Sequence, residues 1–153
     1  MLKYDKHCQV YLVKKDGEFM VLKAPSSSTD YEKEISVLKT LNEKNLTVLG
    51  FPKLFSCLRT NERQEILIEA LGPDLDSCQQ KIMQHQFLAY YYVLHLIDRV
   101  QTLHEANFVH GDITLQNVVV CKDDKHKLYL IDFGQSASIF NEQNIHMKDL
   151  MDH

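Results

Sequence analysis

The sequence predicts an α+β fold in which a strand-rich first half with one helix precedes a second half that opens on a long helix. Three observations support this. Alternating apolar residues flank an Asp-Gly pair near the start, apolar residues recur at helical spacing over 87–106, and a Gly-Pro pair at 72–73 separates the two regions. The length, 153 residues, is that of one domain. We therefore interpret residues 1–153 as a single domain with lobes at 1–71 and 72–153.

Composition excludes several classes of function. Hydrophobic residues at 44% and charged residues at 25% are ordinary for a globular protein, and a net charge of −4 offers no basic face to nucleic acid. The four cysteines show no C-x-x-C spacing, which argues against a thiolate zinc site and a secreted disulfide framework. No apolar run approaches the roughly 20 residues of a membrane helix. We expect an intracellular protein, cytoplasmic or nuclear, that binds neither nucleic acid nor membranes.

The first lobe begins with a predicted hairpin. Residues 8–24 form two strands joined at Asp16-Gly17, because an Asp-Gly pair between alternating apolar residues is a strong hairpin signal. Lys23 lies near the end of the second strand. Two further strands are expected around a polar turn at 60–63, and Gly72-Pro73 ends them.

A helix is predicted over residues 31–43, between the two pairs of strands. Thr29 and Glu32 have the spacing of a capping box at its start. Its buried face should carry four apolar residues: Ile35, Val37, Leu38 and Leu41.

The candidate catalytic and metal-binding residues of the second lobe come after its long helix. Asp112 and Asn117 lie five positions apart in a loop, and Asp132 follows the strand "LYLI", so these oxygens could converge at one edge of a hairpin. Such ligands suit Mg²⁺ together with substrate phosphates, and the loop acid could accept a proton from an attacking hydroxyl. Lys23 offers a positive charge for phosphate, and Glu34 could hold it in place.

These motifs, in this order, resemble the signature set of protein kinases. "VLK", then His-x-Asp-x-x-x-x-Asn, a strand hairpin and Asp-Phe-Gly extend over residues 8–134. "ALGPDLDSC" and "RVQTLHEANFVHGDI" are most similar to the casein kinase one and vaccinia-related kinase group. The resemblance implies a protein-kinase-like fold, with an antiparallel-sheet N-lobe carrying one helix and a truncated helical C-lobe.

The resemblance also implies roles for individual residues. Lys23 would contact the α- and β-phosphates of ATP, and Glu34 would pair with it, Glu32 being the alternative partner. Asp112 would be the catalytic base, supported by His110. The remaining assignments are two ligands of Mg²⁺, Asn117 and Asp132, and two backbone contacts to adenine, Glu69 and Leu71.

Three features depart from the kinase pattern. Residues 1–10 contain no glycine, and Cys8 stands about where the last glycine of a phosphate-covering loop would fall. Gly111 replaces the usual Arg, which resembles the loops of vaccinia-related kinases, aminoglycoside phosphotransferases and the small KEOPS-complex kinase, and Thr114 replaces the usual Lys, which resembles the KEOPS-complex kinase. Only 19 residues follow Gly134, among which "NIHMKDLMDH", with Asp149, could form the helix that supports the catalytic loop.

We expect an ATP-dependent phosphotransferase, namely a protein serine/threonine kinase of minimal or truncated form with a protein substrate. A pseudokinase-type module that binds nucleotide or a partner without transfer is one alternative, and a small-molecule phosphotransferase is another. A shortened C-lobe would expose apolar surface, so we also expect a protein partner or self-association to cover it.

Overall fold

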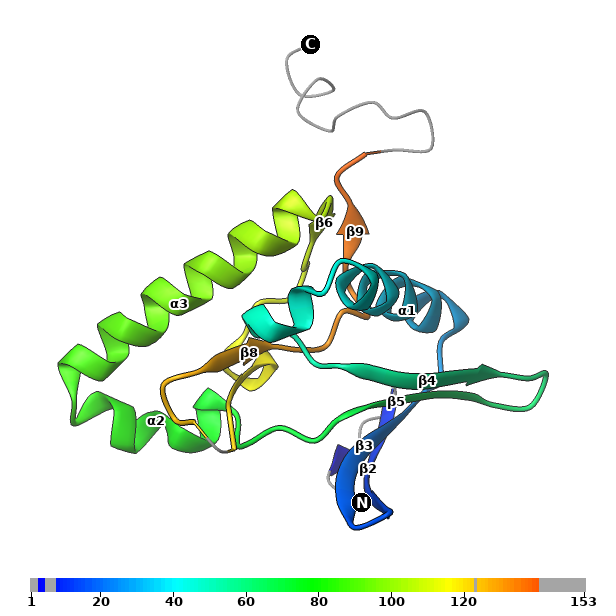
Figure 1. Ribbon diagram of the computed structural model, residues 1–153, viewed down its shortest axis with the longest axis horizontal. Helices are drawn as coiled ribbons and strands as arrows, with labels where there is room; N and C mark the ends of the chain where they lie inside the picture. Colours follow the sequence, from blue (N-terminus) through cyan, green and yellow to red (C-terminus); the bar gives the residue numbers. More distant parts are fainter. Residues whose placement is uncertain (1–2, 5–7, 123, 141–153) are drawn as a thin grey trace.

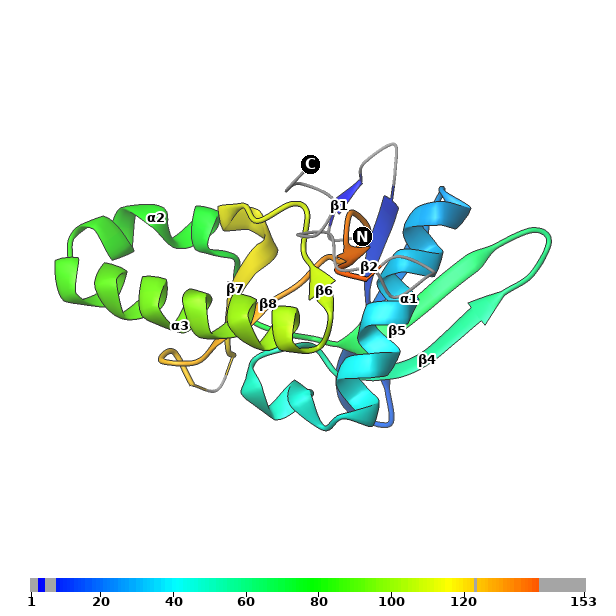
Figure 2. The same ribbon diagram turned by 90° about the horizontal axis from the view of Figure 1, so that it is seen from above.

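The computed structural model of the protein describes residues 3–4, 8–122 and 124–140 (Figure 1). In the first lobe, five antiparallel strands form one sheet in the order β1-β2-β3-β5-β4. Their bounds are β1 Lys3–Tyr4, β2 Cys8–Lys15, β3 Glu18–Pro25, β4 Leu54–Arg59 and β5 Gln64–Glu69. The helix α1, Ser28–Glu43, lies across one face of this sheet (Figure 2). The α+β fold with an antiparallel sheet in its N-lobe is thus confirmed.

The predicted hairpin joins β2 and β3 through Asp16 and Gly17, which have φ of 52° and 88°. Positive φ at both central residues defines the turn type whose twist matches that of the flanking strands. The pairing then runs in register from Lys15 opposite Glu18 to Cys8 opposite Pro25. This register places Lys23 in the sheet interior, between β2 and β5.

The helix α1 buries the four predicted apolar residues, but its predicted cap is wrong. Ser27 is the N-cap, and its hydroxyl accepts a hydrogen bond from the Asp30 backbone N–H at 3.2 Å. The helix therefore begins earlier than expected, which puts Thr29 inside its first turn. Glu32 forms an ion pair with Arg59 of β4 instead of closing a capping box.

The second lobe is led by two helices, α2 (Leu75–Met83) and α3 (Gln86–Glu105). The long helix α3 was predicted and α2 was not. Asp74 caps α2, because its carboxylate accepts a hydrogen bond from the Ser77 backbone N–H at 2.7 Å. Figure 1 shows α3 along one side of the molecule, away from the five-stranded sheet.

Two small two-stranded sheets complete the described part of this lobe. The predicted strands β7 (Val118–Val120) and β8 (Leu128–Leu130) pair with each other, and β6 (Phe108–Val109) pairs with β9 (Ala137–Ser138). Two short 3-10 helices lie at Leu46–Leu49 and Leu115–Asn117. The predicted supporting helix with Asp149 lies outside the described residues.

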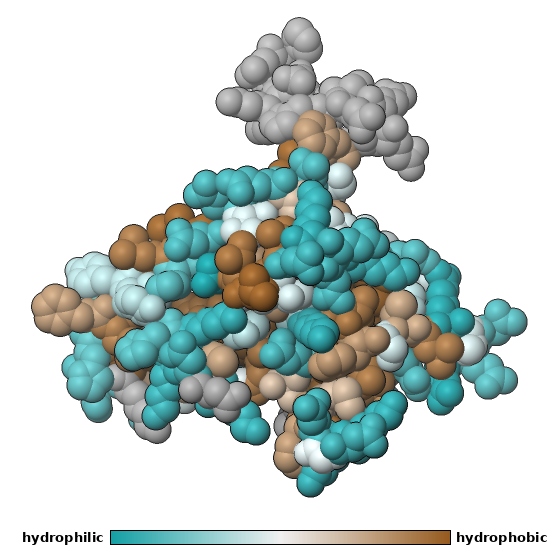
Figure 3. All heavy atoms as spheres, in the orientation of Figure 1, coloured by the Kyte–Doolittle hydropathy of each residue, from teal (hydrophilic) through white to brown (hydrophobic). Residues whose placement is uncertain are grey.

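One hydrophobic core runs through both lobes, joining residues of α1, β5, α3, β7 and β8 with Phe51 and Phe133. The outer face of α3, in contrast, leaves large apolar or aromatic side chains exposed: Phe87, Tyr90, Val93, Leu94 and Ile97. Figure 3 shows hydrophobic surface, interrupted by hydrophilic residues, along that side of the molecule. None of the helices in the described ranges combines the length and apolar character needed to cross a bilayer.

Candidate active site

A cavity of about 390 Å³ lies between the sheet of the first lobe and the loops of the second. Four of the predicted site residues line it: Lys23, Glu34, Asp112 and Asp132. They come from β3, from α1, from the loop after β6 and from the segment after β8. Residues far apart in the sequence therefore meet at one cavity.

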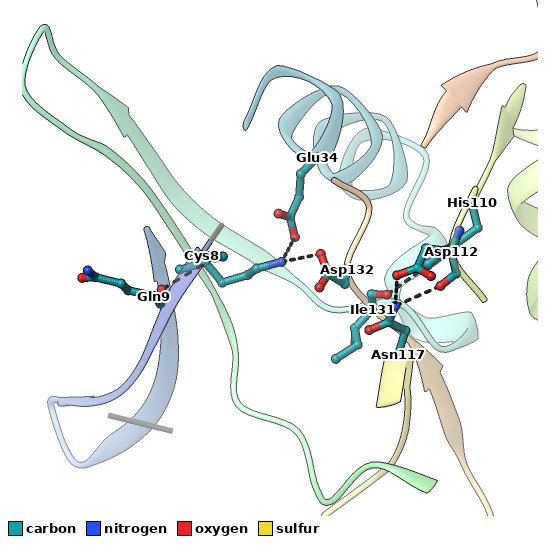
Figure 4. Close-up of polar contacts among 9 residues, drawn as sticks. Cys8, Gln9, Glu34, His110, Asp112, Asn117, Ile131 and Asp132 are labelled. Atoms are coloured by element: carbon teal, nitrogen blue, oxygen red, sulfur yellow. Dashed lines mark hydrogen bonds and ion pairs between the residues drawn. The ribbon is translucent and has the colours of Figure 1, made fainter. Parts of the chain in front are cut away.

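Lys23 connects the two lobes at this cavity. Its ammonium donates hydrogen bonds to Glu34 Oε1 at 2.5 Å and to Asp132 Oδ1 at 3.0 Å (Figure 4). Lys23 and Glu34 are both buried, with 7% and 3% of their surface exposed. Burial alone would lower the pKa of Lys23, but the carboxylates of Glu34 and Asp132 raise it above its ordinary value. Lys23 is therefore a fixed positive charge.

Asp132 adopts a left-handed backbone conformation with φ of 69°, which is uncommon for a residue other than glycine. Its side chain is 48% exposed. Burial raises the pKa of this carboxyl, but the charge and hydrogen bond of Lys23 and the Gly134 N–H hold it below the usual range. Asp132 is thus an ionised carboxylate facing the cavity beside a buried ammonium.

Asn117 holds the loop that carries Asp112. Its Nδ2 donates to the backbone oxygen and to Oδ2 of Asp112, both at 2.9 Å (Figure 4). Asn117 is buried whereas Asp112 is exposed. The amide therefore orients a carboxylate that remains accessible to another molecule.

His110 links this loop to the strand that precedes Asp132. Its Nε2 lies 2.9 Å from the Ile131 carbonyl oxygen, and its Nδ1 accepts from the Asp112 backbone N–H at 3.3 Å. A ring that donates through one nitrogen and accepts through the other must be neutral. Burial lowers the pKa of His110, which favours that neutral form.

The oxygen atoms at this site suit Mg²⁺ that arrives with phosphate. Within the described residues, no group of three or more His, Cys, Asp and Glu side chains could hold a metal by itself. Mg²⁺ is commonly held by one or two carboxylates together with substrate phosphates, and Asp132 is an ionised, half-exposed carboxylate. An amide nitrogen is a donor only, so the oxygen of the Asn117 amide is the atom that could ligate the ion.

The structure does not bring all the predicted residues to the cavity wall. Among the described residues, the cavity lining does not include Asn117, Glu69 or Leu71. The backbone N–H of Glu69 donates to the Lys53 carbonyl at 3.0 Å. A backbone contact from Glu69 to adenine would therefore use the carbonyl of Glu69.

Sequence reasoning missed several lining residues: Val10, Pro25, Asp30 and Gln135. The register of β2 against β3 places Val10 directly opposite Lys23, a signal that the predicted hairpin already contained. Asp30 carries no comparable signal, because its approach to the Asp132–Gly134 segment depends on the packing of α1.

The geometry agrees with the comparison to known proteins. A family model described as "Protein kinase domain" matches residues 6–151. The chain belongs to the protein kinase family. The family predicted from the motifs is thus confirmed.

The relatives of this kinase domain include poxvirus proteins. It is 31% identical over 77 residues to "B1 kinase" of monkeypox virus and of vaccinia virus (strain Western Reserve), which covers 48% of this chain and 25% of each relative. It is 28% identical to "Probable serine/threonine-protein kinase FPV226" of fowlpox virus, covering 70% of this chain and 37% of the relative. These similarities agree with the predicted vaccinia-related group, and the chain spans well under half the length of these relatives.

A solved structure shows the same fold. The kinase PK-1 of Cydia pomonella granulovirus superposes with a TM-score of 0.72 at 24% sequence identity. The match covers 84% of this chain and 48% of that one. The kinase-like fold is therefore confirmed over most of the chain.

Proposed function

We propose that this kinase domain binds Mg-ATP in the cavity between its lobes and transfers the γ-phosphate to a serine or threonine of a protein. The observation that carries the proposal is the pair of contacts from Lys23 to Glu34 and Asp132, in a cavity that Asp112 also lines. Phosphoryl transfer depends mostly on positioning and charge stabilisation, and this arrangement can supply both.

Each residue has a role in this proposal. Lys23, held by Glu34, contacts the α- and β-phosphates, and Asp112 accepts the proton of the attacking hydroxyl. Asn117 and Asp132 would hold Mg²⁺, which neutralises charge on the phosphates when bound. The adenine would contact the backbone of two further residues, Glu69 through its carbonyl and Leu71.

The charges that line the cavity support a requirement for Mg²⁺ in ATP binding. Among the described lining residues, four acids face a single cation: Asp30, Glu34, Asp112 and Asp132 against Lys23. A polyphosphate without divalent ions would be repelled by this excess of negative charge. ATP should therefore bind only together with Mg²⁺.

The test is a titration of the purified chain with ATP, with and without Mg²⁺, followed by thermal unfolding. A ligand that binds only the folded state raises the melting temperature by mass action. We expect a rise with Mg-ATP and none with ATP in EDTA. Absence of any rise at millimolar Mg-ATP would contradict the proposal.

A nucleotide-binding module without transfer activity is the second candidate. Cys8 and Val10 line the cavity, and residues 1–10 contain no glycine to allow close approach of backbone to phosphate. Incubation with labelled ATP, Mg²⁺ and a mixture of proteins separates the two candidates, because only the enzyme transfers label. Label on an aminoglycoside in a parallel reaction would instead favour the small-molecule phosphotransferase suggested by His110-Gly111-Asp112.

The exposed apolar face of α3 supports a further part of the proposal, which is that a protein partner or a second copy covers it. The face continues into a groove of about 810 Å³, with Ile97, Val100 and Ile113 among its lining residues. Exposed apolar patches of this kind commonly mark protein–protein contacts. Sedimentation velocity at increasing concentration tests self-association directly, and a monomer at all concentrations would exclude it.

A further inference from the structure

Gly111 lies where the loop before Asp112 meets the segment after Asp132. Its φ is 82°, a left-handed conformation that favours glycine. A Cβ atom built on Gly111 would stand 2.2 Å from the backbone oxygen of Gln135 and 3.0 Å from its carbonyl carbon. Both atoms belong to main chain, which cannot rotate away as a flexible side chain could. Any side chain at position 111 would have to push the Gln135 peptide outward.

The Gln135 peptide belongs to a segment that is fixed on both sides of this contact. On one side, the Ser136 N–H donates to the Phe133 carbonyl at 3.0 Å, and the side chain of Phe133 is fully buried. On the other side, β9 pairs with β6, and the Ile139 N–H donates to the Asn107 carbonyl at 2.9 Å. A displacement of Gln135 would therefore be transmitted along the segment rather than absorbed by a mobile loop.

This segment and the Gly111 loop carry two of the four acids that line the cavity, Asp132 and Asp112. Asp112 follows Gly111 directly, Asp132 lies three positions before Gln135, and both Gly134 and Gln135 line the cavity. The two segments are also joined by His110, whose Nε2 lies 2.9 Å from the Ile131 carbonyl oxygen. The contact at Gly111 is thus one of the points that fix the spacing between the two carboxylates.

We propose that Gly111 is a positioning residue, whose missing side chain lets the Gln135 peptide rest on the catalytic loop and thereby sets Asp132 relative to Asp112. This role depends on the absence of a side chain at position 111. It does not depend on charge, although an arginine at this position would also add a cation. It rests on the proposed function, because the spacing of the two carboxylates matters only if they act on one metal-bound nucleotide.

The experiment compares Gly111→Asn with Gly17→Asn. Gly17 has a φ of 88° but nothing within 4 Å of a Cβ, so it matches Gly111 in backbone conformation without the close contact. Asparagine tolerates the left-handed region, so the backbone cost is small at both positions. Gly111→Ala and Gly17→Ala repeat the comparison with the smallest possible side chain should Gly111→Asn not fold.

Two measurements are made on each variant. The first is amide hydrogen exchange of the protein without ligand, which reports the order of residues 131–139. The second is the Mg²⁺ concentration that gives half of the Mg-ATP thermal shift, which a general loss of stability would not move. We expect faster exchange over 131–139 and an approximately tenfold higher Mg²⁺ requirement in the Gly111 variant, with both readouts unchanged in the Gly17 variant.

The outcomes separate the two proposals. Wild-type exchange over 131–139 and a wild-type Mg²⁺ requirement in the Gly111 variants would overturn the positioning role. Equal changes in the Gly17 variants would overturn it as well, since the contact would then not be the cause. A wild-type protein that gives no Mg-ATP shift would remove the proposed function, and the exchange comparison would still decide whether Gly111 holds the segment.

Discussion

The ammonium of Lys23 donates a hydrogen bond to the carboxylate of Asp132 at 3.0 Å, although the two residues are 109 positions apart in the sequence. The same ammonium holds the buried carboxylate of Glu34. One side chain therefore joins the sheet, the helix α1 and the segment after β8. Its removal should affect folding and nucleotide binding by separate routes.

Lys23→Met should lower the free energy of unfolding by about 3–5 kcal/mol, because it leaves the buried Glu34 carboxylate without a partner. The double variant Lys23→Met/Glu34→Leu should regain most of that stability, since neither charge is then buried alone. Mg-ATP should raise the melting temperature of neither variant. Urea denaturation and the thermal shift measure the two effects, and a double variant that still binds Mg-ATP as wild type does would contradict the role of Lys23.

Asp112→Asn should leave the Mg-ATP thermal shift within a degree or so of wild type and reduce phosphate transfer by about 10²–10⁴-fold. Asparagine can still accept the hydrogen bond from Asn117, so the loop should keep its shape. The measurement is initial rate with labelled ATP and a protein substrate.

Asp98→Asn, on the exposed surface of α3, is the matched control and should transfer at the wild-type rate. A fully active Asp112→Asn protein would show that this carboxylate is not the base.

Local signals in the sequence predicted much of this fold. The Asp16-Gly17 turn specifies the first hairpin by itself, and the spacing of apolar residues along α1 gives its buried face, because both depend on neighbours within a few residues. The start of α1 was predicted wrongly because four consecutive Ser/Thr residues, 26–29, precede it and each could act as the cap, and Glu32 pairs with Arg59 on β4 instead of closing a capping box. Such a contact is invisible before the strands are placed.

The shortest strands were missed altogether. The strands β1, β6 and β9 are two residues long, and each exists only because another segment lies beside it. The residues of the site likewise divide into those that local motifs predict and those that only tertiary packing brings to the cavity. The motifs predicted Lys23, Asp112 and Asp132, whereas Asp30 and Gln135 reach the cavity through tertiary packing alone.

Asn117→Asp should reduce the rate of phosphate transfer. The aspartate would place a second carboxylate about where Nδ2 now lies 2.9 Å from Asp112 Oδ2, and two carboxylates at that separation cannot both ionise readily. The acidic limb of the pH–rate profile should therefore lie at higher pH in Asn117→Asp than in wild type. An unshifted limb would show that Asn117 does not act on the Asp112 carboxylate.

The neutral state of His110 makes the stability of the protein depend on pH. Burial lowers the pKa of His110 and Lys23 acts in the same direction, while the hydrogen bond to the Ile131 carbonyl and the carboxylates of Asp132 and Asp112 oppose the shift without cancelling it. The folded state therefore binds fewer protons than the unfolded state once the pH falls below the unfolded-state pKa of about 6.5. The stability that neutral His110 contributes is fully present above that pH and is lost as the pH falls through the lower folded-state pKa.

His110→Gln should flatten this dependence, because glutamine does not titrate. We expect the wild-type free energy of unfolding to fall between pH 7.5 and 5.5, with a slope from this residue of at most about 1.4 kcal/mol per pH unit. The variant should be less stable than wild type at pH 7.5, where it loses the bridge between Ile131 and Asp112, and closer to it at pH 5.5. His85→Gln, at the exposed start of α3, should keep the wild-type slope. Parallel curves for wild type and His110→Gln, measured by urea denaturation across this range, would mean that protonation of His110 does not limit stability.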